Sequence, residues 1–245
     1  MELNKEMTLA EIVNRDYRTV PALEGLNLDY CCRGKRTLDE ACTEAGLDVN
    51  IIIEKLKNAR TYETSNYDYE SWEPDFLIDY IINIHHSYVK KYIPLISAHS
   101  EKVKNAHSAN HPEVIKIAEL FETVKSDLES HLLKEERMLF PYIKNLAVIN
   151  RGTGNFEAAP FGTVQNPIRV MEMEHEAAGN MFYEIRKLSN NYQPPEDACI
   201  TFKTLYEELK DFESDLHKHI HLENNILHPK AIAMEKELRK NIEIN

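Results

Sequence analysis

Two histidine–glutamate pairs constrain this chain more than any other feature of its sequence. One pair is His131 and Glu135, the other is His219 and Glu223, and the members of each pair are four residues apart. On a helix this spacing places both side chains on the same face, about one turn apart, so both can reach one metal cluster. Two such pairs on two helices predict a shared metal site.

The alternative is that each pair is a solvated couple on a helix surface, which is common at this spacing. The neighbouring apolar residues argue against it, because they recur every three or four residues on the same face as the pairs. They are Ile117, Leu120, Val124, Leu128, Met138 and Tyr142 in the first helix, and Leu205, Leu209, Phe212, Leu216 and Ile226 in the second. A buried imidazole and carboxylate need a partner, and a metal ion satisfies both.

The apolar pattern predicts four long helices, at about residues 74–105, 112–147, 166–191 and 195–228. A proline stands at or near the start of each, as is typical of first helical turns. One long loop separates the second helix from the third, and the other connections are short, which favours antiparallel neighbours. We therefore expect an all-α protein, with an up-down-up-down four-helix bundle over residues 74–245.

The first 60 residues predict a small separate helical domain. Thr8 with Glu11 and Thr37 with Glu40 match the capping-box pattern that begins a helix. Residues 61–73 are polar, rich in tyrosine and poor in aliphatic side chains, which is typical of a linker.

Between the two capping boxes lie the adjacent cysteines Cys31 and Cys32, followed by Arg33 and Lys35. Nearby cations favour the thiolate form of cysteine, so we expect a redox or metal-transfer role for this pair. The alternative is that both are small buried hydrophobic residues. The remaining two cysteines show no spacing typical of a disulfide framework, and we expect them to be structural.

The first and third bundle helices each carry a histidine, His86 and His175, on the same apolar face as their spaced aliphatic residues. Four imidazoles and two carboxylates suit a pair of iron or manganese ions, with Glu135 and Glu223 as bridges. The predicted metal ligands are His86, His131, Glu135, His175, His219 and Glu223.

Other polar residues near the site have less defined roles. His85, beside His86, is the alternative ligand. His217 and His221 point away from the apolar face, so we expect them to be solvated. Glu174 is a candidate for lining an access path. Three aspartates are candidates for holding the ligand imidazoles in place: Asp79, Asp127 and Asp215.

The charge of the chain excludes some classes of partner. Its 41 acidic and 29 basic residues give a formal net charge of −12, which repels nucleic acids and anionic membranes. No apolar run reaches the ~18–20 residues of a spanning helix, and the beginning of the chain does not read as a signal peptide. We therefore expect a cytoplasmic protein whose cysteines are reduced.

Three motifs give the chain a family resemblance. They are DYCC-G-K at residues 29–35, SH-x-x-KEE-x-x-LFP at 130–141, and HI-x-LENN-x-L-x-P at 219–229. A short helical domain with the first motif, followed by a bundle with the other two, resembles the repair-of-iron-centres (RIC) family, whose bundle is a hemerythrin-like di-iron domain.

The resemblance implies two non-heme iron ions held by the six predicted ligands, bridged by Glu135 and Glu223 and, as an option left open, by an oxo group as well. It implies a homodimer that acts under oxidative and nitrosative stress. The family restores damaged clusters of iron–sulfur proteins, which the resemblance makes the partners of this chain.

Three functions remain open at this stage. The first is an iron donor for cluster repair, in which Cys31 and Cys32 pass on iron or supply electrons. The second is an enzyme, a di-iron nitric oxide reductase. The third is a sensor that binds NO or O2 in the bundle and signals through the small domain.

Overall fold

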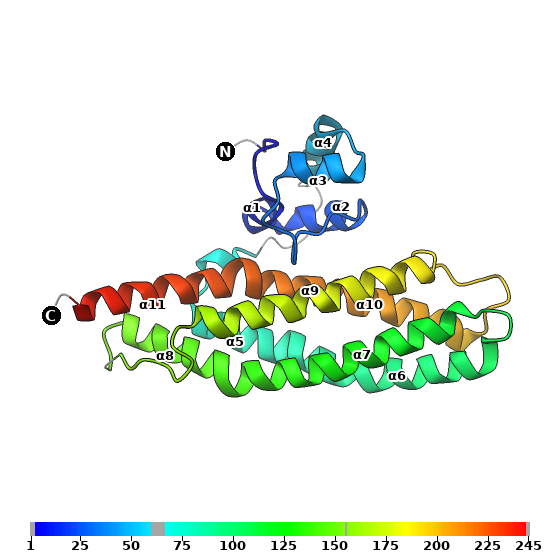
Figure 1. Cartoon of the computed structure of the whole chain (residues 1–245). Helices are drawn as coiled ribbons and strands as arrows, with labels where there is room; N and C mark the ends of the chain where they lie inside the picture. Colours follow the sequence, from blue (N-terminus) through cyan, green and yellow to red (C-terminus); the bar gives the residue numbers. More distant parts are fainter. Residues whose placement is uncertain (1–2, 60–66, 155, 244–245) are drawn as a thin grey trace.

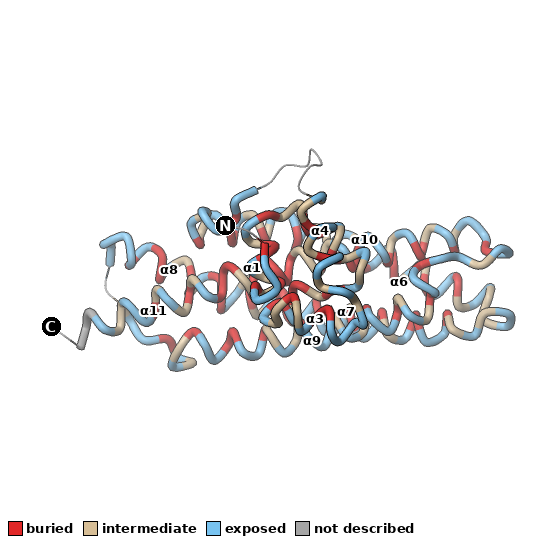
Figure 2. Tube along the Cα trace, turned by 90° about the horizontal axis from the view of Figure 1, so that it is seen from above, coloured by how far each residue is buried: buried red, intermediate tan, exposed pale blue. Residues whose placement is uncertain are grey.

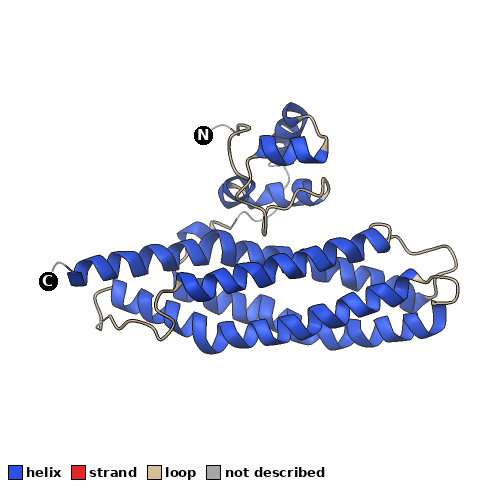
Figure 3. Cartoon of the chain, viewed as in Figure 1, coloured by secondary structure: helices blue, strands red, loops and turns tan. Residues whose placement is uncertain are grey.

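The structure is a computed structural model that describes residues 3–59, 67–154 and 156–243 (Figure 1). Within these ranges the chain is helical, and its β-structure is limited to one isolated bridge between Thr8 and Thr37. The prediction of an all-α bundle preceded by a small helical domain is confirmed. Figure 3 shows the small domain lying on one side of a long helical bundle.

The small domain is built from short helices with well-defined ends. Thr8 Oγ1 accepts a hydrogen bond from the Glu11 amide at 3.2 Å, and the Glu11 carboxylate accepts one from the Thr8 amide at 2.8 Å. This is the predicted capping box, and Thr37 and Glu40 repeat it. The helices are α1 (Leu9–Arg15), η1 (Tyr17–Thr19), α2 (Val20–Glu24), α3 (Leu38–Ala45) and α4 (Val49–Ala59).

The bundle consists of four long antiparallel helices (Figure 1), three of which contain a π-helical segment. The first combines α5 (Pro74–Tyr80), η3 (Ile81–His86) and α6 (Ser87–His107). The second combines α7 (Glu113–Lys134), η4 (Glu135–Leu139) and α8 (Phe140–Asn150). The third is α9 (Gln165–Leu188), and the fourth combines α10 (Ile200–Leu222), η5 (Glu223–Leu227) and α11 (His228–Glu243).

The fourth helix differs from its predicted bounds of 195–228. It begins at Ile200 and continues to Glu243, past Pro229. Proline lacks an amide N–H and clashes with the preceding turn of an α-helix. Here the widened turn of η5 comes directly before the turn that holds Pro229, and η4 precedes Pro141 in the same way. The wider turns make room for both prolines, so neither helix ends there.

One buried apolar cluster extends from the small domain into the bundle. It includes Leu9 and Leu38 of the small domain together with Phe121, Phe182 and Phe212 of the bundle. A second cluster fills the end of the bundle near α8 and α11. The tube in Figure 2, seen from above, shows buried residues along the bundle and in the small domain that overlies it. The two domains therefore share apolar packing.

Part of the predicted linker has a regular structure. Residues 61–66 lie outside the described residues, but Tyr69–Ser71 form a short 3-10 helix, η2, in which Tyr69 is buried. Among the described helices, none has both the length and the apolar character needed to cross a membrane.

Candidate metal centre

The four bundle helices bring all six predicted ligands together in the interior. Each side chain is at most 2% exposed. Three of the six lie at an end of a π-helical segment: His86 ends η3, Glu135 begins η4 and Glu223 begins η5. A π-turn changes the direction in which the following side chains project, and such turns are frequent at functional sites.

The ligand atoms form two groups that have both glutamates in common. In each group the candidate atoms lie within 4.8 Å of one another. The groups are His86, Glu135, His219 and Glu223, and His131, Glu135, His175 and Glu223. This is the donor arrangement expected for two adjacent cations with two carboxylates between them and two imidazoles each.

Several polar atoms of this cluster lack the partners that burial normally requires. Both carboxylate oxygens of Glu135 and the Nε2 atom of His86 have no hydrogen-bond partner among the described residues. The Nε2 atoms of His131 and His175 face each other at 2.9 Å. Buried polar groups without partners are costly. Cations between these atoms would satisfy them all, so the residues fit a two-metal centre.

The charges in the cluster shift its pKa values strongly. Burial opposes the charged form of His86, but the nearby carboxylates of Glu135 and Glu223, 3.4 and 3.8 Å from its Nε2 atom, outweigh burial and raise its pKa to about 9. Burial also opposes the charged form of His131, yet the Glu135 charge raises its pKa to about 10. Burial disfavours ionisation of Glu223, but the facing imidazoles hold its pKa well below the ordinary value. Burial likewise disfavours ionisation of Glu135, but the imidazoles of His131 and His86 lower its pKa to about 2. Both carboxylates are therefore ionised, as carboxylate metal ligands must be.

Three of the imidazoles are oriented by a second polar group. His86 Nδ1 lies 2.8 Å from Glu136 Oε1, and His131 Nδ1 lies 2.8 Å from Glu174 Oε2. His175 Nδ1 lies 2.9 Å from Asn224 Oδ1. Such contacts fix the tautomer and ring orientation of metal-binding histidines. All three partners are direct sequence neighbours of predicted ligands, and this position could have indicated their role from the sequence alone.

The aspartates predicted for this role do not fill it. Asp79 is exposed and pairs with Lys144, and Asp215 pairs with His85 at 2.9 Å. Asp127 is exposed on the outer face of α7. The prediction is wrong because it took them as lying on or beside the inner seams, whereas the π-turns bring Glu136 and Asn224 to the imidazoles instead. Glu174, predicted to line an access path, instead contacts His131.

Three further histidines are buried around the centre. His85 lies outside both ligand groups and stacks on His219, with ring centroids 5.7 Å apart. His228 stacks on His175 at 6.3 Å, and burial lowers its pKa to about 4. His221 was predicted to be solvated, which is wrong: it is fully buried beneath the small domain, where desolvation lowers its pKa to about 3.

The two adjacent cysteines lie against the helix that carries His175. Cys32 Sγ is 3.4 Å from the His175 carbonyl oxygen. One turn further along α9, a Cβ atom at Gly179 would lie 3.3 Å from the same sulfur, so glycine permits this approach. The Asn225 side chain donates hydrogen bonds to the Tyr30 and Cys31 carbonyl oxygens at 3.1 and 3.4 Å. The segment of residues 29–35, called the cysteine loop below, is therefore docked directly on the metal-site helices.

The predicted thiolate is wrong for Cys31. Its sulfur is buried and lies 3.2 Å from Asp29 Oδ1, and burial raises its pKa well above the ordinary value. The cations expected to lower it are turned to other surroundings, since Lys35 pairs with Glu172 at 3.2 Å and Arg33 is exposed.

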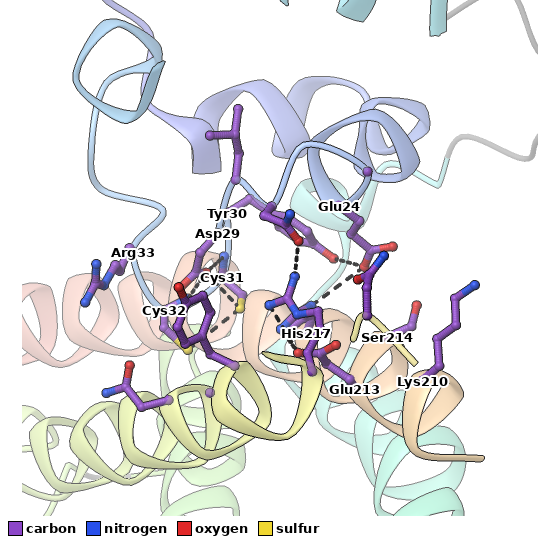
Figure 4. Close-up of a pocket in the computed structure, with 18 of the residues that line it drawn as sticks. Glu24, Asp29, Tyr30, Cys31, Cys32, Arg33, Lys210, Glu213, Ser214 and His217 are labelled. Carbon is purple, nitrogen blue, oxygen red and sulfur yellow. Dashed lines mark hydrogen bonds and ion pairs between the residues drawn. The ribbon is translucent and has the colours of Figure 1, made fainter. Parts of the chain in front are cut away.

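A cavity of about 720 Å³ adjoins the cysteine loop, between the small domain and helices α9 and α10. Figure 4 shows Cys31 and Cys32 at one end of it and Glu213 and His217 further along. His217 was predicted to be solvated; it is partly buried and lines this cavity. Partly exposed Cys32 and buried Cys31 both line this cavity, which therefore connects the cysteine loop with solvent without passing through the bundle.

Comparison with known proteins agrees with this architecture. The hemerythrin HHE cation binding domain matches residues 77–231, and the ScdA_N domain, a domain of unknown function (DUF542), matches residues 5–60. These matches cover the bundle and the small domain separately.

Relatives match both parts together. The iron-sulfur cluster repair protein YtfE of Dickeya chrysanthemi is 32% identical over 231 residues, covering 94% of this chain and 99% of the relative. A probable iron-sulfur cluster repair protein of Haemophilus influenzae is 36% identical over 208 residues, covering 84% and 87%. YtfE of Yersinia pseudotuberculosis is 34% identical over 208 residues, covering 85% and 88%. The chain therefore belongs to the family of two-domain hemerythrin proteins that its motifs predicted, the repair-of-iron-centres family.

Proposed function

We propose that this protein repairs damaged iron–sulfur clusters by supplying iron, with the buried histidine–glutamate cluster as the store and the two cysteines as the exit. The observation that supports this best is the 3.4 Å contact between Cys32 Sγ and the His175 carbonyl oxygen. A thiol pair that lies on a metal-site helix and faces a solvent cavity is well situated to receive an ion from one side and release it to the other.

In this proposal the six ligands would hold two iron ions, and these ions are what the protein delivers. Glu135 and Glu223 would offset part of the charge of the two ions, while Glu136, Glu174 and Asn224 keep the imidazoles aligned. Four imidazoles leave the ions with fewer protein ligands than they can accept, which favours release.

Next to the bundle, Asp29, Cys31 and Cys32 form a third group whose candidate ligand atoms lie within 4.8 Å of one another. A soft thiolate pair with one carboxylate suits ferrous iron in transit. Binding there requires both thiols to lose their protons, and the adjoining cavity gives those protons a route to solvent.

The proposed setting follows the family resemblance. All four cysteines are free, which supports a reducing compartment such as the cytoplasm. Oxidative and nitrosative stress would create the damaged clusters, and we propose that the protein acts on their host proteins as a homodimer.

The test is anaerobic repair of a hydratase whose iron–sulfur cluster has been damaged. Iron-loaded protein should restore hydratase activity, and Cys31→Ser/Cys32→Ser protein with the same iron content should restore much less. Cys199→Ser, which changes an exposed cysteine far from the site, is the matched control and should behave like the unaltered protein. Recovery no greater than that given by free ferrous iron would contradict the proposal.

A second candidate is the reduction of nitric oxide. The observation that favours it is that the two ligand groups have both Glu135 and Glu223 in common. Two groups joined in this way would hold two iron ions side by side. Two NO molecules, two electrons and two protons give one nitrous oxide and one water, and the iron pair would supply the electrons. Nitrous oxide yield from the reduced, iron-loaded protein decides between formation of this product and simple NO binding.

A further inference from the structure

A continuous line of aromatic rings connects the surface of the protein with the metal-site cluster. The ring centroids of Trp72 and Tyr80 are 5.1 Å apart, and those of Tyr80 and His85 are 5.7 Å apart. His85 then stacks on His219 at 5.7 Å, with only 10° between the ring planes. Four rings therefore lead from Trp72 to a predicted metal ligand.

Both ends of this aromatic line suit a path between the interior and solvent. At the inner end, His219 Nε2 is 2.9 Å from Glu223 Oε1, inside the ligand cluster. At the outer end, Trp72 is partly buried and touches two exposed rings, Phe76 at 57% and Tyr67 at 52% exposure. Trp72 is also the single tryptophan of the chain.

Local structure holds the rings in place. Phe76 and Tyr80 lie one turn apart on the same face of α5, and the Trp72 ring, just before that helix, packs against both. Lys230 Nζ donates a hydrogen bond to the Trp72 carbonyl oxygen at 2.6 Å. Asp215 Oδ1 lies 2.9 Å from His85 Nδ1 and fixes the orientation of that ring.

Packing alone does not explain why a histidine stands at position 85, in the middle of the aromatic line. His85 is 1% exposed, and its Nε2 atom has no hydrogen-bond partner among the described residues. An apolar ring at this position would fill the same space without leaving a buried polar atom unsatisfied. The imidazole stands between the tyrosine and the ligand, where a conjugated ring bridges the two.

We propose that Trp72, Tyr80 and His85 carry oxidising equivalents from the metal centre to the surface, where external reductants remove them. Electron transfer slows steeply with distance, so several short steps between rings are faster than one long step. Tryptophan and tyrosine are the side chains here that give up one electron most readily, and His85 serves as the bridge. This inference rests on the proposed function, because it requires a redox-active metal in the cluster.

The chemistry balances for hydrogen peroxide as oxidant and ascorbate as reductant. Peroxide takes up two electrons and two protons and becomes two waters. Each electron passes from Tyr80 across the His85 ring, while the partly exposed phenol of Tyr80 releases its proton to solvent. Trp72 then reduces Tyr80, which regains a proton, and one ascorbate reduces Trp72. Two passes consume one peroxide and leave the protein unchanged.

The first experiment locates oxidative damage. Iron content is measured, the reduced iron-loaded protein is treated with peroxide without ascorbate, and oxidised residues are identified by peptide mass spectrometry. We expect damage at Trp72 and Tyr80 in the unaltered protein. In Tyr80→Phe protein, which keeps the ring but is hard to oxidise, damage should shift to His219 and the other ligands. Tyr92→Phe, on α6 outside the line, is the control and should leave the pattern unchanged. An identical pattern in Tyr80→Phe protein would overturn the proposal.

The second experiment needs no metal and so separates this inference from the proposed function. A ruthenium tris-bipyridine photo-oxidant generates the Trp72 radical in iron-free protein, and its decay is followed by transient absorption and electron paramagnetic resonance. We expect the two rings to exchange the hole in both directions, so that a Tyr80 radical appears beside the Trp72 radical, and we expect Tyr80→Phe to lengthen the life of the Trp72 radical. Tyr92→Phe, whose ring packs against Tyr88 and not against any ring of the line, is again the control. A Trp72 radical that decays equally fast in Tyr80→Phe and unaltered protein would overturn the relay even if iron loading and repair succeed.

Discussion

Asn224 and Asn225 are neighbours in the chain, yet they serve opposite sides of the same helix. The Oδ1 atom of Asn224 lies 2.9 Å from His175 Nδ1 in the metal centre, whereas the Nδ2 atom of Asn225 lies 3.1 Å from the Tyr30 carbonyl oxygen in the small domain. Both belong to the π-helical segment η5 that Glu223 begins. One turn of backbone therefore joins a carboxylate that belongs to both ligand groups, the partner of a ligand imidazole, and the side chain that supports the cysteine loop.

Replacing Asn225 should loosen the cysteine loop without emptying the metal centre. Asn225→Ala removes two hydrogen bonds to the loop. A typical hydrogen bond contributes about 0.5–1.5 kcal/mol, so the loss of two should accelerate labelling of buried Cys31 by about fivefold to 150-fold. Thiol labelling resolved by peptide mass spectrometry measures this. Asn105→Ala, a surface change on α6, is the control. Unchanged labelling of Cys31 would mean that Asn225 does not hold the loop.

Glu174 should tune iron affinity although it touches no metal-binding atom. Glu174→Gln keeps the size of the side chain but removes the charge that pairs with His131 Nδ1, and loss of such a partner typically weakens metal binding about 10–100-fold. Competition with a ferrous chelator measures the change. Glu176→Gln, an exposed carboxylate two residues along α9, should bind iron as the unaltered protein does. Equal affinities for all three proteins would assign Glu174 to another role.

Iron binding should release protons. In the metal-free protein the pKa values of about 9 for His86 and about 10 for His131 lie above neutral pH, so both imidazoles are charged. Ligation requires their neutral forms, so loading at pH 7 should release about two protons and the affinity should rise about 100-fold per pH unit until the pH nears the lower pKa. Calorimetry in buffers of different ionisation enthalpy counts these protons, and a count of zero would refute the assignment.

The raised pKa values of His86 and His131 also determine how the stability of the metal-free protein changes with pH. Because these pKa values are higher in the folded state than in the unfolded chain, the charged imidazoles add to the free energy of unfolding. This contribution is fully present when the pH is below the ordinary pKa of histidine, and it is lost as the pH rises through about 9 to 10.

The extension of the fourth helix past Pro229 should be needed for stability. Glu235 is buried in α11, where its carboxylate accepts hydrogen bonds from Tyr142 Oη at 2.7 Å and from the Val164 amide, just before α9, at 3.0 Å. Glu235→Ala leaves both donors unpaired and should lower the free energy of unfolding by about 1–3 kcal/mol. Denaturant unfolding measures it, with the exposed Glu237→Ala as control. An equal effect of both changes would contradict this account.

The sequence predicted the architecture well because the relevant signals are local. Apolar spacing, capping boxes and short connections are enough to define antiparallel helices. The same spacing singled out the six side chains that the structure brings together, since a histidine on an apolar seam faces the centre of the bundle.

What the sequence did not reveal depends on contacts between distant segments. The π-turns that begin at Glu135 and Glu223 occur where side chains from several helices meet, and no local preference marks them. His221 was assigned to solvent because its direction on an isolated helix is outward, but the small domain covers that face. Asp215 lies one helical turn from the predicted ligand His219, but its side chain contacts His85 rather than a predicted ligand.

Because Gly179 has no side chain, the Cys32 thiol can pack against α9 at this point. The contacts that seat the cysteine loop nearest the centre consist of a glycine, a thiol, carbonyl oxygens and the Asn225 amide, none of which carries a formal charge. Salt screens charged pairs such as the exposed Lys35–Glu172 bridge, but it has little effect on neutral contacts of this kind. The thiols should therefore keep their place beside the bundle over a wide range of ionic strength, whatever the charge of the protein that receives the iron.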